Sequence, residues 1–466
     1  MLAIALTLFL FLCSLFFSLL CHGQDDTCDE FACNSESTHS LVLIEACSRY
    51  KPEAPCICET APPNDEYSAN LKVEKWSSIP GLPIEVFSAF IDSRSWSQPR
   101  SVQKPSRRHT IRIISHGLQA EYRNVDETYC SANLHGKGRL YLGKADYVRI
   151  YESVIHHDEY TAHFLHCYWP DHLAPPLHVT VGSAPCSTPS QSVTVPVLSP
   201  SLAPSSIPLP LKLGACISPI YGYKPLLLAE FIETYRFIGI KHFTFYVFKT
   251  SKELRTLLQY YKKEGIATLV EWPLDTMRHN YFYFDQRSAL NDCLYRNWGN
   301  VKFVAFIDLD EILAPRAHPD LVTLVEELVR QEGSTLASIC FQHVFFERNN
   351  SDILANYSPT FTTQTRFSRT SQVFPEGKIR SKCMHDPSLT VATDIHFAQW
   401  WINDSVREVM LPENMAILQH YRPSRLEKMR KEPEKFQFLN DYFLLKFREQ
   451  LTMRVTNILK ALNITI

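Results

Sequence analysis

The spacing of hydrophobic and polar residues changes partway along the chain. Before about residue 185, short segments such as IEVFSAFID, HTIRIISHG and GRLYLGK alternate apolar with polar residues, and turn-forming residues separate them. This period of two is typical of half-buried strands in an antiparallel sheet. We therefore predict a β-rich accessory domain over residues 70–184, a sandwich or barrel in which Cys130 and Cys167 can form a disulfide.

After residue 212 two kinds of segment alternate. LLLAEFIETYRFIGI and LVTLVEELVRQEG have apolar residues at helical spacing, whereas KHFTFYVF, IATLVEW and VKFVAFID are nearly continuous apolar runs. Strands that are apolar on both faces and alternate with helices favour a mostly parallel sheet covered on both sides. We predict an α/β domain over residues 212–466.

Two further segments have the composition of connections. Residues 185–211 contain seven prolines, which favour an extended backbone and predict a semi-rigid linker. Residues 24–69 hold five cysteines among polar residues and predict a disulfide-stapled stem. Zinc binding by these closely spaced cysteines is the alternative interpretation, but an oxidising compartment disfavours it.

The N-terminus points to the secretory pathway. Residues 1–23 contain an uncharged apolar run from Leu2 to Leu20, which is either a cleaved signal peptide or an uncleaved membrane anchor. Twelve of the fourteen cysteines lie beyond Cys21, as expected where disulfides form. We predict a location in the Golgi or ER lumen, as a single-pass type II membrane protein or as a secreted one. Four Asn-x-Ser/Thr sequons predict glycosylation; they begin at Asn349, Asn356, Asn403 and Asn463.

Bulk composition excludes one class of partner. Apolar residues make up 45 % of the chain and charged residues 21 %, which is typical of globular proteins. The formal net charge is −2, so the overall charge does not indicate a protein that binds nucleic acid. Any specific function must therefore come from individual motifs.

The strand VKFVAFID runs directly into a group of carboxylates. Asp308 stands at its end and Asp310 two residues later, with no basic residue beside them in the sequence. Ligands of open α/β sheets bind beyond the carboxyl ends of the strands. In an extended backbone Asp308 and Asp310 would face the same side, while Glu311 would face the other and cap or pair instead.

Two adjacent carboxylates favour a bound cation. At about 5 Å they repel each other by about 3 kcal/mol at an effective dielectric near 20. A divalent ion such as Mg²⁺ or Mn²⁺ removes that cost and suits the diphosphate of a nucleotide sugar. Two other interpretations remain: a solvated strand end, or a phosphatase of the haloacid-dehalogenase type. Ile312 stands where such phosphatases usually have Thr or Val, which disfavours the second.

Several segments together resemble glycosyltransferase family 92. The matching pieces, over roughly 214–450, are CISPIYG, IETYRFIGIKHFTFY, DQRSALNDCLYR, FIDLDEILAP and ILQHYRP, with a weaker echo in VFSAFIDSR. The resemblance implies a GT-A-type, Rossmann-like catalytic domain in the secretory pathway. It also implies an inverting galactosyltransferase that uses UDP-galactose, with Mn²⁺ (or Mg²⁺) as the metal and a glycan as acceptor.

The resemblance also implies roles for particular residues. Metal binding falls to Asp308, Asp310 and His396. Contacts to the nucleotide-sugar donor fall to Gln286, Asn291, Asp292, Asp308, Lys382, His420 and Arg422. Inverting transfer needs a general base, for which the candidates by position are Glu376, Asp394, Asp404 and Glu408.

One other class of function is compatible with the same motifs. The chain could be a catalytically inactive, carbohydrate-binding relative that is secreted or displayed at the cell surface. The intact Asp308-Leu309-Asp310 favours the enzyme.

Overall fold

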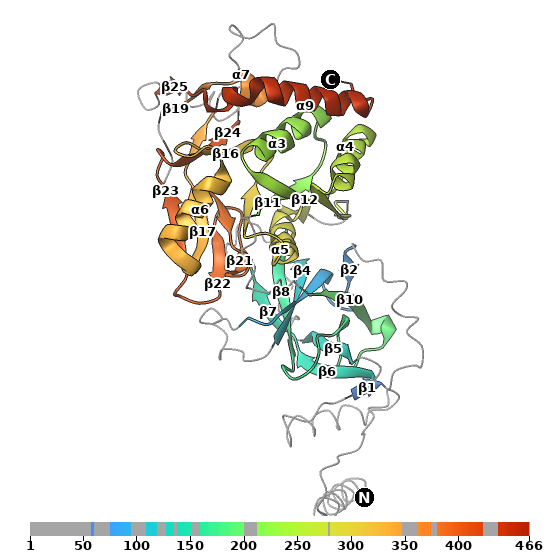
Figure 1. The fold of residues 1–466 in the computed structure, drawn as a ribbon. Coiled ribbons are helices and arrows are strands. Elements are labelled where there is room, and N and C mark those ends of the chain that lie inside the picture. Colours follow the sequence, from blue (N-terminus) through green and yellow to red (C-terminus); the bar gives the residue numbers. More distant parts are fainter. Residues whose placement is uncertain are drawn as a thin grey trace, which may run out of the picture.

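The computed structural model in Figure 1 describes two regions of regular structure. The described residues are 57–59, 75–94, 109–118, 127–134, 138–150, 159–199, 212–277, 280–346, 361–371, 373, 380–422 and 437–465. The predicted signal peptide or anchor lies outside these residues, as do Glu376, Asn349 and Asn356. No helix within the described part of the chain is both long and apolar enough to cross a membrane.

A seven-stranded sheet forms the centre of the C-terminal region, in the order β13-β12-β11-β15-β20-β17-β23. Its strands are β11 (Leu213–Ile220), β12 (Ile240–Val247), β13 (Ala267–Glu271), β15 (Phe303–Ile307), β17 (Leu336–Phe341), β20 (Lys382–His385) and β23 (Arg407–Leu411). Strands β11, β12, β13 and β15 are mutually parallel, but β20 runs antiparallel to both neighbours. The α/β prediction is confirmed as a mixed sheet rather than a purely parallel one.

Alternate residues of the central strands face different layers. Ala215, Phe245 and Ala305 belong to a core shared with the helices on one face. Cys216, Tyr246 and other residues of opposite parity belong to a second core. The helices are α3 (Pro225–Phe237), α4 (Lys252–Lys263), α5 (Gln286–Asn297), α6 (Leu321–Glu332), α7 (Thr362–Thr365) and α9 (Arg448–Ala461). Helix α5 lies on the opposite face from α3 and α4, toward the β-rich region (Figure 1).

Short elements surround the sheet. Strands β16 (Glu311–Pro315), β24 (Ala416–His420) and β18 (His343–Phe345) form a small sheet beside the end of β15. The others are β19 (Ser368–Thr370) with β25 (Phe438–Asn440), β21 (Thr390–Thr393) with β22 (Ala398–Trp401), and the 3₁₀ turns η3 (Pro189–Gln191), η4 (Phe282–Phe284), η5 (Gly333–Thr335) and η7 (Phe443–Phe447).

The N-terminal strands form the β-rich region, here residues 57–198, around an eleven-stranded sheet. Its members are β1 (Ile57–Glu59), β2 (Ser77–Ser78), β3 (Ile84–Asp92), β4 (His109–Leu118), β5 (Tyr129–Leu134), β6 (Gly138–Lys144), β7 (Asp146–Arg149), β8 (Glu159–Trp169), β9 (His178–Gly182), β10 (Ser192–Leu198) and β14 (Asn280–Tyr281). Most neighbours are antiparallel, as the period of two predicts, whereas β10–β3 and β14–β8 are parallel.

Two predicted boundaries change. Strand β1 lies inside the predicted stem, and Cys58 forms a disulfide with Cys186. Strand β10 lies inside the predicted linker, where it pairs with β9 from Ser192 to Pro196 and with β3 at Val197 and Leu198. The sheet therefore extends beyond residues 70–184 on both sides.

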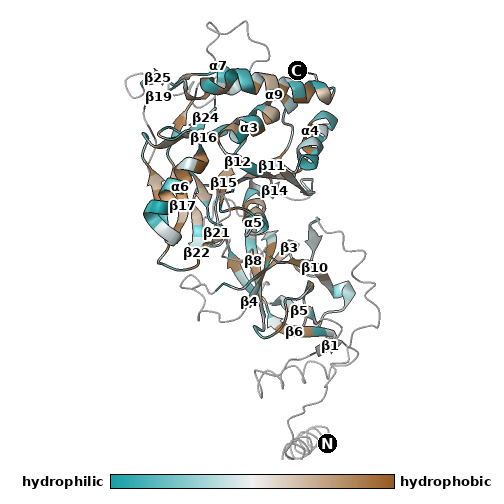
Figure 2. Cartoon of the chain, viewed as in Figure 1, coloured by the Kyte–Doolittle hydropathy of each residue, from teal (hydrophilic) through white to brown (hydrophobic). Residues whose placement is uncertain are grey.

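The two regions share a hydrophobic core. Phe87 and Phe90 of β3 and Phe164 of β8 pack in one cluster with Trp272 and Tyr295 from the C-terminal region. The Phe87 and Trp272 ring centroids are 4.6 Å apart. Figure 2 shows hydrophobic residues along the strands of both regions. Strand β14, contributed by the C-terminal region, adds a backbone connection because it pairs with β8.

Further disulfides tie the elements together. The predicted Cys130–Cys167 bridge is present in the β-rich region. Cys216 of β11 is joined to Cys293 of α5, and Cys340 of β17 to Cys383 of β20. The compartment inferred from the cysteine count stays a prediction.

Candidate functional site

The carboxylate motif lies on a tight turn at the carboxyl end of β15. The Glu311 N–H donates to the Asp308 carbonyl at 3.1 Å, which closes a turn over Asp308 to Glu311. The backbone is therefore turned here. The prediction of an extended backbone from Asp308 to Asp310 is wrong. Glu311 folds back so that its carboxylate accepts the Asp308 N–H at 2.9 Å. The capping role predicted for Glu311 is confirmed.

Three side chains hold the Asp308 carboxylate. Ser218 at the end of β11 donates to Oδ1 at 2.8 Å, and Gln286 at the start of α5 donates to the same oxygen at 3.1 Å. Lys382 of β20 donates to Oδ2 at 2.8 Å. Desolvation alone would raise the pKa of Asp308, but the Lys382 charge and these hydrogen bonds lower it to about 2. Asp308 is therefore a fixed anion.

Asp310 is the more open of the two aspartates. Its side chain is 44 % exposed, compared with 35 % for Asp308. The His420 Nε2 atom of β24 lies 3.4 Å from Asp310 Oδ2. The Tyr421 N–H donates to the Asp310 carbonyl at 2.8 Å, which fixes the backbone. This leaves the Asp310 carboxylate available to a ligand.

Buried cations face the carboxylates from elsewhere in the fold. Lys382 is 1 % exposed, and its Nζ lies 3.5 Å from Glu311 Oε2 in addition to its bond with Asp308. Desolvation would lower the pKa of Lys382, but the carboxylates raise it. Desolvation raises the pKa of Glu311 to about 7 although Lys382 opposes the shift. Burial would lower the pKa of His420, but Asp310 and Glu311 raise it. Part of the repulsion inferred from the sequence is therefore cancelled by Lys382.

His396 and Asp394 lie next to the strand that carries Lys382. The His396 ring Nδ1 is 3.0 Å from the Ser381 carbonyl, and desolvation, followed by the charge of Lys382, lowers the pKa of His396 to about 4. His396 is therefore a neutral imidazole, the form that ligates metals. Asp394 accepts a hydrogen bond from Arg287 Nε at 2.7 Å and is buried.

Two predicted donor contacts on α5 are instead occupied within the protein. Asn291 is fully buried and bonds the Thr393 backbone in both directions, at 2.8 Å and 3.0 Å. Asp292 is also fully buried and accepts hydrogen bonds from Ser88, Tyr246 and Arg296. Asp292 therefore joins the two regions, and neither residue is directed at the carboxylate turn.

Of the remaining predicted residues, Arg422 stays beside the carboxylate turn, because it follows Tyr421, whose N–H bonds the Asp310 carbonyl, whereas two predicted bases lie elsewhere. Asp404 is exposed and precedes β23, which runs parallel to β17, so it lies toward the amino end of that strand pair. Glu408 is paired with Ser338 of β17 in the same ladder, away from the end at Phe341. Arg422 is exposed just after His420. The sequon asparagines Asn403 and Asn463 are both exposed, as glycan acceptors must be.

Sequence reasoning missed some supporting groups. Ser218 bonds both Asp308 and the Gln286 amide, and the Tyr223 hydroxyl donates to the Leu309 carbonyl at 3.1 Å. Ser218 lies near the end of β11 and Tyr223 follows that strand. Their position at the carboxyl end of a neighbouring strand, in CISPIYGY, is the sequence signal that could have identified them.

The turn just before Gln286 has an unusual backbone. Tyr283, Phe284 and Asp285 have φ values of 45°, 56° and 57°, so three successive non-glycine residues are left-handed. Such a conformation costs about 1–2 kcal/mol per residue. Strain of this kind persists only where the surroundings hold it, and it is common beside functional sites.

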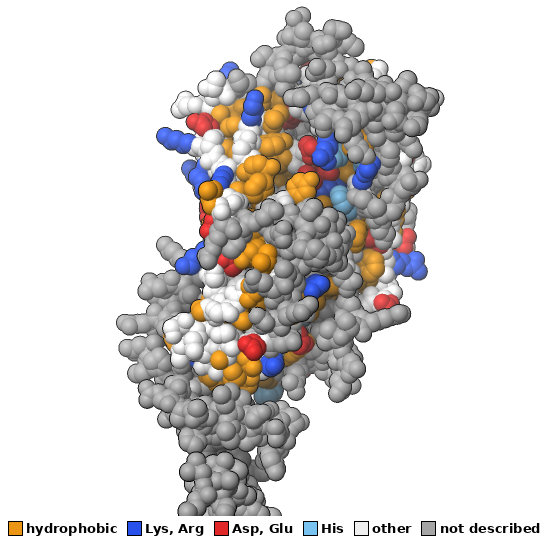
Figure 3. Space-filling model, turned by 180° about the vertical axis from the view of Figure 1, so that it is seen from behind, with side chains coloured by type: hydrophobic (Ala, Val, Ile, Leu, Met, Phe, Trp, Pro, Cys, Tyr) orange, Lys and Arg blue, Asp and Glu red, His pale blue; other side chains and the backbone are white. Residues whose placement is uncertain are grey.

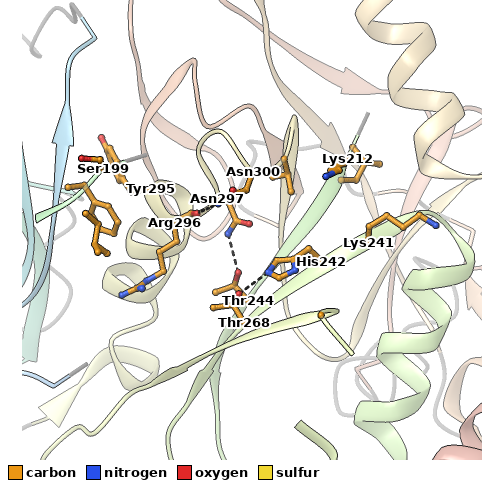
Figure 4. Close-up of a pocket in the computed structure, with 15 residues that line it drawn as sticks. Ser199, Lys212, Lys241, His242, Thr244, Thr268, Tyr295, Arg296, Asn297 and Asn300 are labelled. Carbon is orange, nitrogen blue, oxygen red and sulfur yellow. Dashed lines mark hydrogen bonds between the residues drawn. The ribbon is translucent and has the colours of Figure 1, made fainter. Parts of the chain in front are cut away.

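Two pockets lie on different edges of the sheet. The larger, of about 680 Å³, is lined by Lys212, Lys241 and Val301 at the starts of β11, β12 and β15. Figure 4 shows this pocket and its polar lining, including the His242–Thr268 hydrogen bond of 2.9 Å. It lies at the edge opposite to Asp308. A smaller pocket, of about 300 Å³, includes Asp310 and Leu309 in its lining.

The residues at the turn fit a divalent ion through Asp310. Hard carboxylate oxygens suit Mg²⁺ or Mn²⁺, and the Asp310 carboxylate is accessible, whereas both Asp308 oxygens already accept hydrogen bonds. Among the described residues, the one trio of potential ligands found close together is Cys340, Cys383 and Glu408. Its cysteines form a disulfide and offer no thiolate. In Figure 3 acidic, basic and histidine side chains gather on the rear face.

Comparison with known proteins gives the family. The model of glycosyltransferase family 92 matches residues 212–454, slightly more than half of the chain. The matched range contains β11 to β25, α3 to α7 and the carboxylate turn. The chain belongs to glycosyltransferase family 92.

The curated relatives are distant and match only in part. Beta-1,4-galactosyltransferase galt-1 from Caenorhabditis elegans is 26 % identical over 227 residues, which cover 46 % of this chain and 49 % of that protein. Another glycosyltransferase family 92 protein of the same animal is 27 % identical over 206 residues, 41 % of this chain and 39 % of that one. The chain therefore spans about half the length of these relatives or less.

Solved structures give a weaker likeness. Glucosyl-3-phosphoglycerate synthase from Mycobacterium tuberculosis with phosphoglyceric acid is 12 % identical, with a TM-score of 0.23, over 47 % of this chain and 75 % of that one. The same enzyme with Mn²⁺, uridine-diphosphate-glucose and phosphoglyceric acid is 11 % identical, also with a TM-score of 0.23, over 53 % of this chain and 80 % of that one. At these TM-scores the likeness carries no argument about the site.

Proposed function

We propose that this protein is a metal-dependent, inverting glycosyltransferase that moves a hexose from a nucleotide sugar to a glycan acceptor. The observation that carries the proposal is the Asp308–Asp310 turn, fixed at the carboxyl end of a central strand inside the family-matched region, with Asp310 accessible. UDP-galactose is the donor we propose, because one partial relative is named a galactosyltransferase.

We propose a separate role for each residue beside the donor diphosphate. A metal bound at Asp310 would neutralise the charge that develops on the leaving nucleotide. The sequence also predicts Asp308 and His396 as ligands, and Asp308 would join the metal site only by giving up one of its present hydrogen bonds. Lys382 supplies positive charge beside the turn, His420 Nε2 lies 3.4 Å from Asp310, and Gln286 orients Asp308 through its 3.1 Å hydrogen bond. Fixed cations of this kind stabilise a transition state without reorganisation.

Asp394 is the general base that we propose to test first. Asp394 is two residues before His396, whose ring contacts the Ser381 carbonyl next to Lys382. Asp404 and Glu408 instead lie along another part of the sheet. The Asp394 carboxylate accepts the Arg287 Nε–H at 2.7 Å, which fixes its orientation. Four disulfides and the exposed Asn403 and Asn463 support our proposal of a lumenal location.

A panel of nucleotide sugars tests the proposed function. The purified protein is incubated with each donor, with Mn²⁺ or with a chelator, and release of the nucleoside diphosphate is followed with and without fucosylated and non-fucosylated glycans. We expect turnover of UDP-galactose that needs the metal. Turnover of another UDP-hexose would change the donor only.

Absence of turnover with every donor would contradict the enzyme. In that case glycan binding measured by calorimetry decides whether the inactive, carbohydrate-binding alternative is correct. In that case Asp310→Asn should bind glycan as tightly as the wild type, both with and without Mn²⁺.

A further inference from the structure

A strained turn connects the carboxylate site to the β-rich region. Tyr283, Phe284 and Asp285 are all left-handed, and the next residue, Gln286, is the first of α5 and donates to Asp308. Of the three, only Asp285 is of a type that adopts this conformation readily. The turn therefore needs contacts that hold it in place.

The contacts come largely from the other region of the protein. His116 of β4 lies with Nδ1 2.7 Å from Asp285 Oδ2, and its Nε2 is 2.8 Å from Glu85 Oε2 of β3. The His116 and Asp285 side chains are 0 % and 2 % exposed. Trp76 stacks on the imidazole with a centroid distance of 3.6 Å. His116 is thus a buried bridge between two carboxylates from separate regions.

Two further contacts hold the turn within the C-terminal region. The Trp272 indole N–H donates to the Phe284 carbonyl at 3.0 Å, and the Ser288 hydroxyl donates to Asp285 Oδ1 at 2.8 Å. Just before the turn, Asn280 and Tyr281 pair with Glu159 and Tyr160 of β8. The backbone leading into Gln286 is therefore anchored on the β-rich region along several residues.

We propose that His116 is a positioning residue for the carboxylate site. By bridging Glu85 and Asp285, it fixes the left-handed turn and so places the Gln286 amide on Asp308. The β-rich region then contributes to the geometry of the carboxylate site. The effect on catalysis rests on the proposed function, whereas the effect on the turn does not.

Two single variants and their combination test this proposal. His116→Gln removes the bridging imidazole, and Asp285→Asn removes the charge while keeping a residue that tolerates the left-handed conformation. His163→Gln is the matched control, because His163 is a buried histidine of the neighbouring strand β8 whose pKa desolvation lowers to about 3. Each protein is measured for hydrogen–deuterium exchange of the 280–292 peptide and for kcat and KM with the donor from the panel.

We expect faster exchange at 280–292 in His116→Gln and Asp285→Asn but not in His163→Gln. We expect kcat to fall by about 10- to 100-fold in both, with a smaller change in KM, because a small displacement of an orienting group costs rate. The double variant should be no worse than either single variant, since both act on one contact. If His116→Gln fails to fold, Asp285→Asn alone carries the test.

Two results would overturn the proposal. The first is faster exchange with unchanged kcat, which would make the bridge purely structural. The second is a double variant whose loss is the product of the single losses, since the two residues would then act independently. If the wild-type protein turns over no donor, the proposed function fails. Unchanged exchange at 280–292 in all variants would separately reject the role of His116 in holding the left-handed turn.

Discussion

At the residue scale, the carboxylate turn is controlled by partners that are distant in the sequence. Asp308 and Asp310 could be selected from the sequence because they follow an apolar strand. Lys382 could not be assigned as their partner from spacing alone, because it is 74 positions from Asp308 along the chain and reaches it only through the antiparallel β20. The fixed position of Glu311 depends on a turn that the extended-strand argument did not include.

Removing Lys382 should destabilise the fold. Lys382→Met leaves Asp308 and Glu311 without their buried cation, and we expect a loss of about 2–3 kcal/mol. This is below the about 3–5 kcal/mol of a fully buried pair, because Asp308 is 35 % exposed. Urea unfolding measures this loss of stability. Lys302→Met is the control, because Lys302 also pairs with an aspartate, Asp386, but its side chain is 38 % exposed. Equal losses in the two variants would contradict this account of the site.

His116 should make stability depend on pH. Desolvation alone would lower the pKa of His116, but Asp285 and Glu85 raise it above 6.5. A raised pKa in the folded state means that the contribution is complete below pH 6.5 and is lost as pH rises through the folded-state pKa. We expect the free energy of unfolding to fall from pH 6 to pH 9 by less in His116→Gln than in the wild type. Parallel pH curves for the two proteins would refute this.

At the scale of single elements, periodicity predicted most strands and helices but missed those with unusual neighbours. Strand β10 was hidden by Pro196, which lacks an N–H and normally excludes a strand. Pro196 pairs with His178 of β9, but β3 begins to pair only at Val197. Pro196 is tolerated because it has a strand neighbour on one side only. Strand β20 has four residues and runs antiparallel, so no alternation of strand and helix could predict it.

The turn between α3 and β12 should require glycine. At Gly239 φ is +110°, and an added Cβ would lie 2.9 Å from Val322 Cγ2 of α6. At Gly143 φ is +100°, and nothing lies within 4 Å of an added Cβ. Both alanine variants carry backbone strain, but we expect Gly239→Ala to lose about 1–3 kcal/mol more because of overpacking. Thermal unfolding of the two variants measures this difference, and equal melting temperatures would contradict it.

At the scale of the whole molecule, the sequence predicted two separate units, whereas the structure joins them through a common core. Strand β3 carried a signal of this, because the alternation in IEVFSAFID is incomplete: consecutive apolar residues at 86–87 and 89–91 place apolar side chains on both faces. One face packs with Ile84, Val86 and Ala89 inside the β-rich region, and Phe87 and Phe90 pack against the other region. Sequence alone could not identify the covering partner, since apolar residues do not specify what they contact.

Separating the regions should therefore fail. A chain of residues 212–466 would expose Trp272 and Tyr295, which pack against the β-rich region, and would lose the His116–Asp285 contact. We expect this fragment to aggregate or to lose its cooperative unfolding transition, as seen by size-exclusion chromatography and calorimetry. A soluble fragment that melts cooperatively near the melting temperature of the full chain would show that the shared core is dispensable.

The central claim is that Asp310 serves a metal-dependent transfer reaction, and one comparison of variants tests it most directly. Turnover of the donor found in the panel is measured with Mn²⁺ for the wild type, for Asp310→Asn and for Asp320→Asn. Asp320 caps α6 by accepting the Thr323 N–H at 2.8 Å, a role that Asn fills equally well. We predict that Asp310→Asn folds normally but loses at least about 100-fold in kcat, while Asp320→Asn keeps full activity. Unchanged metal-dependent turnover in Asp310→Asn would contradict the account.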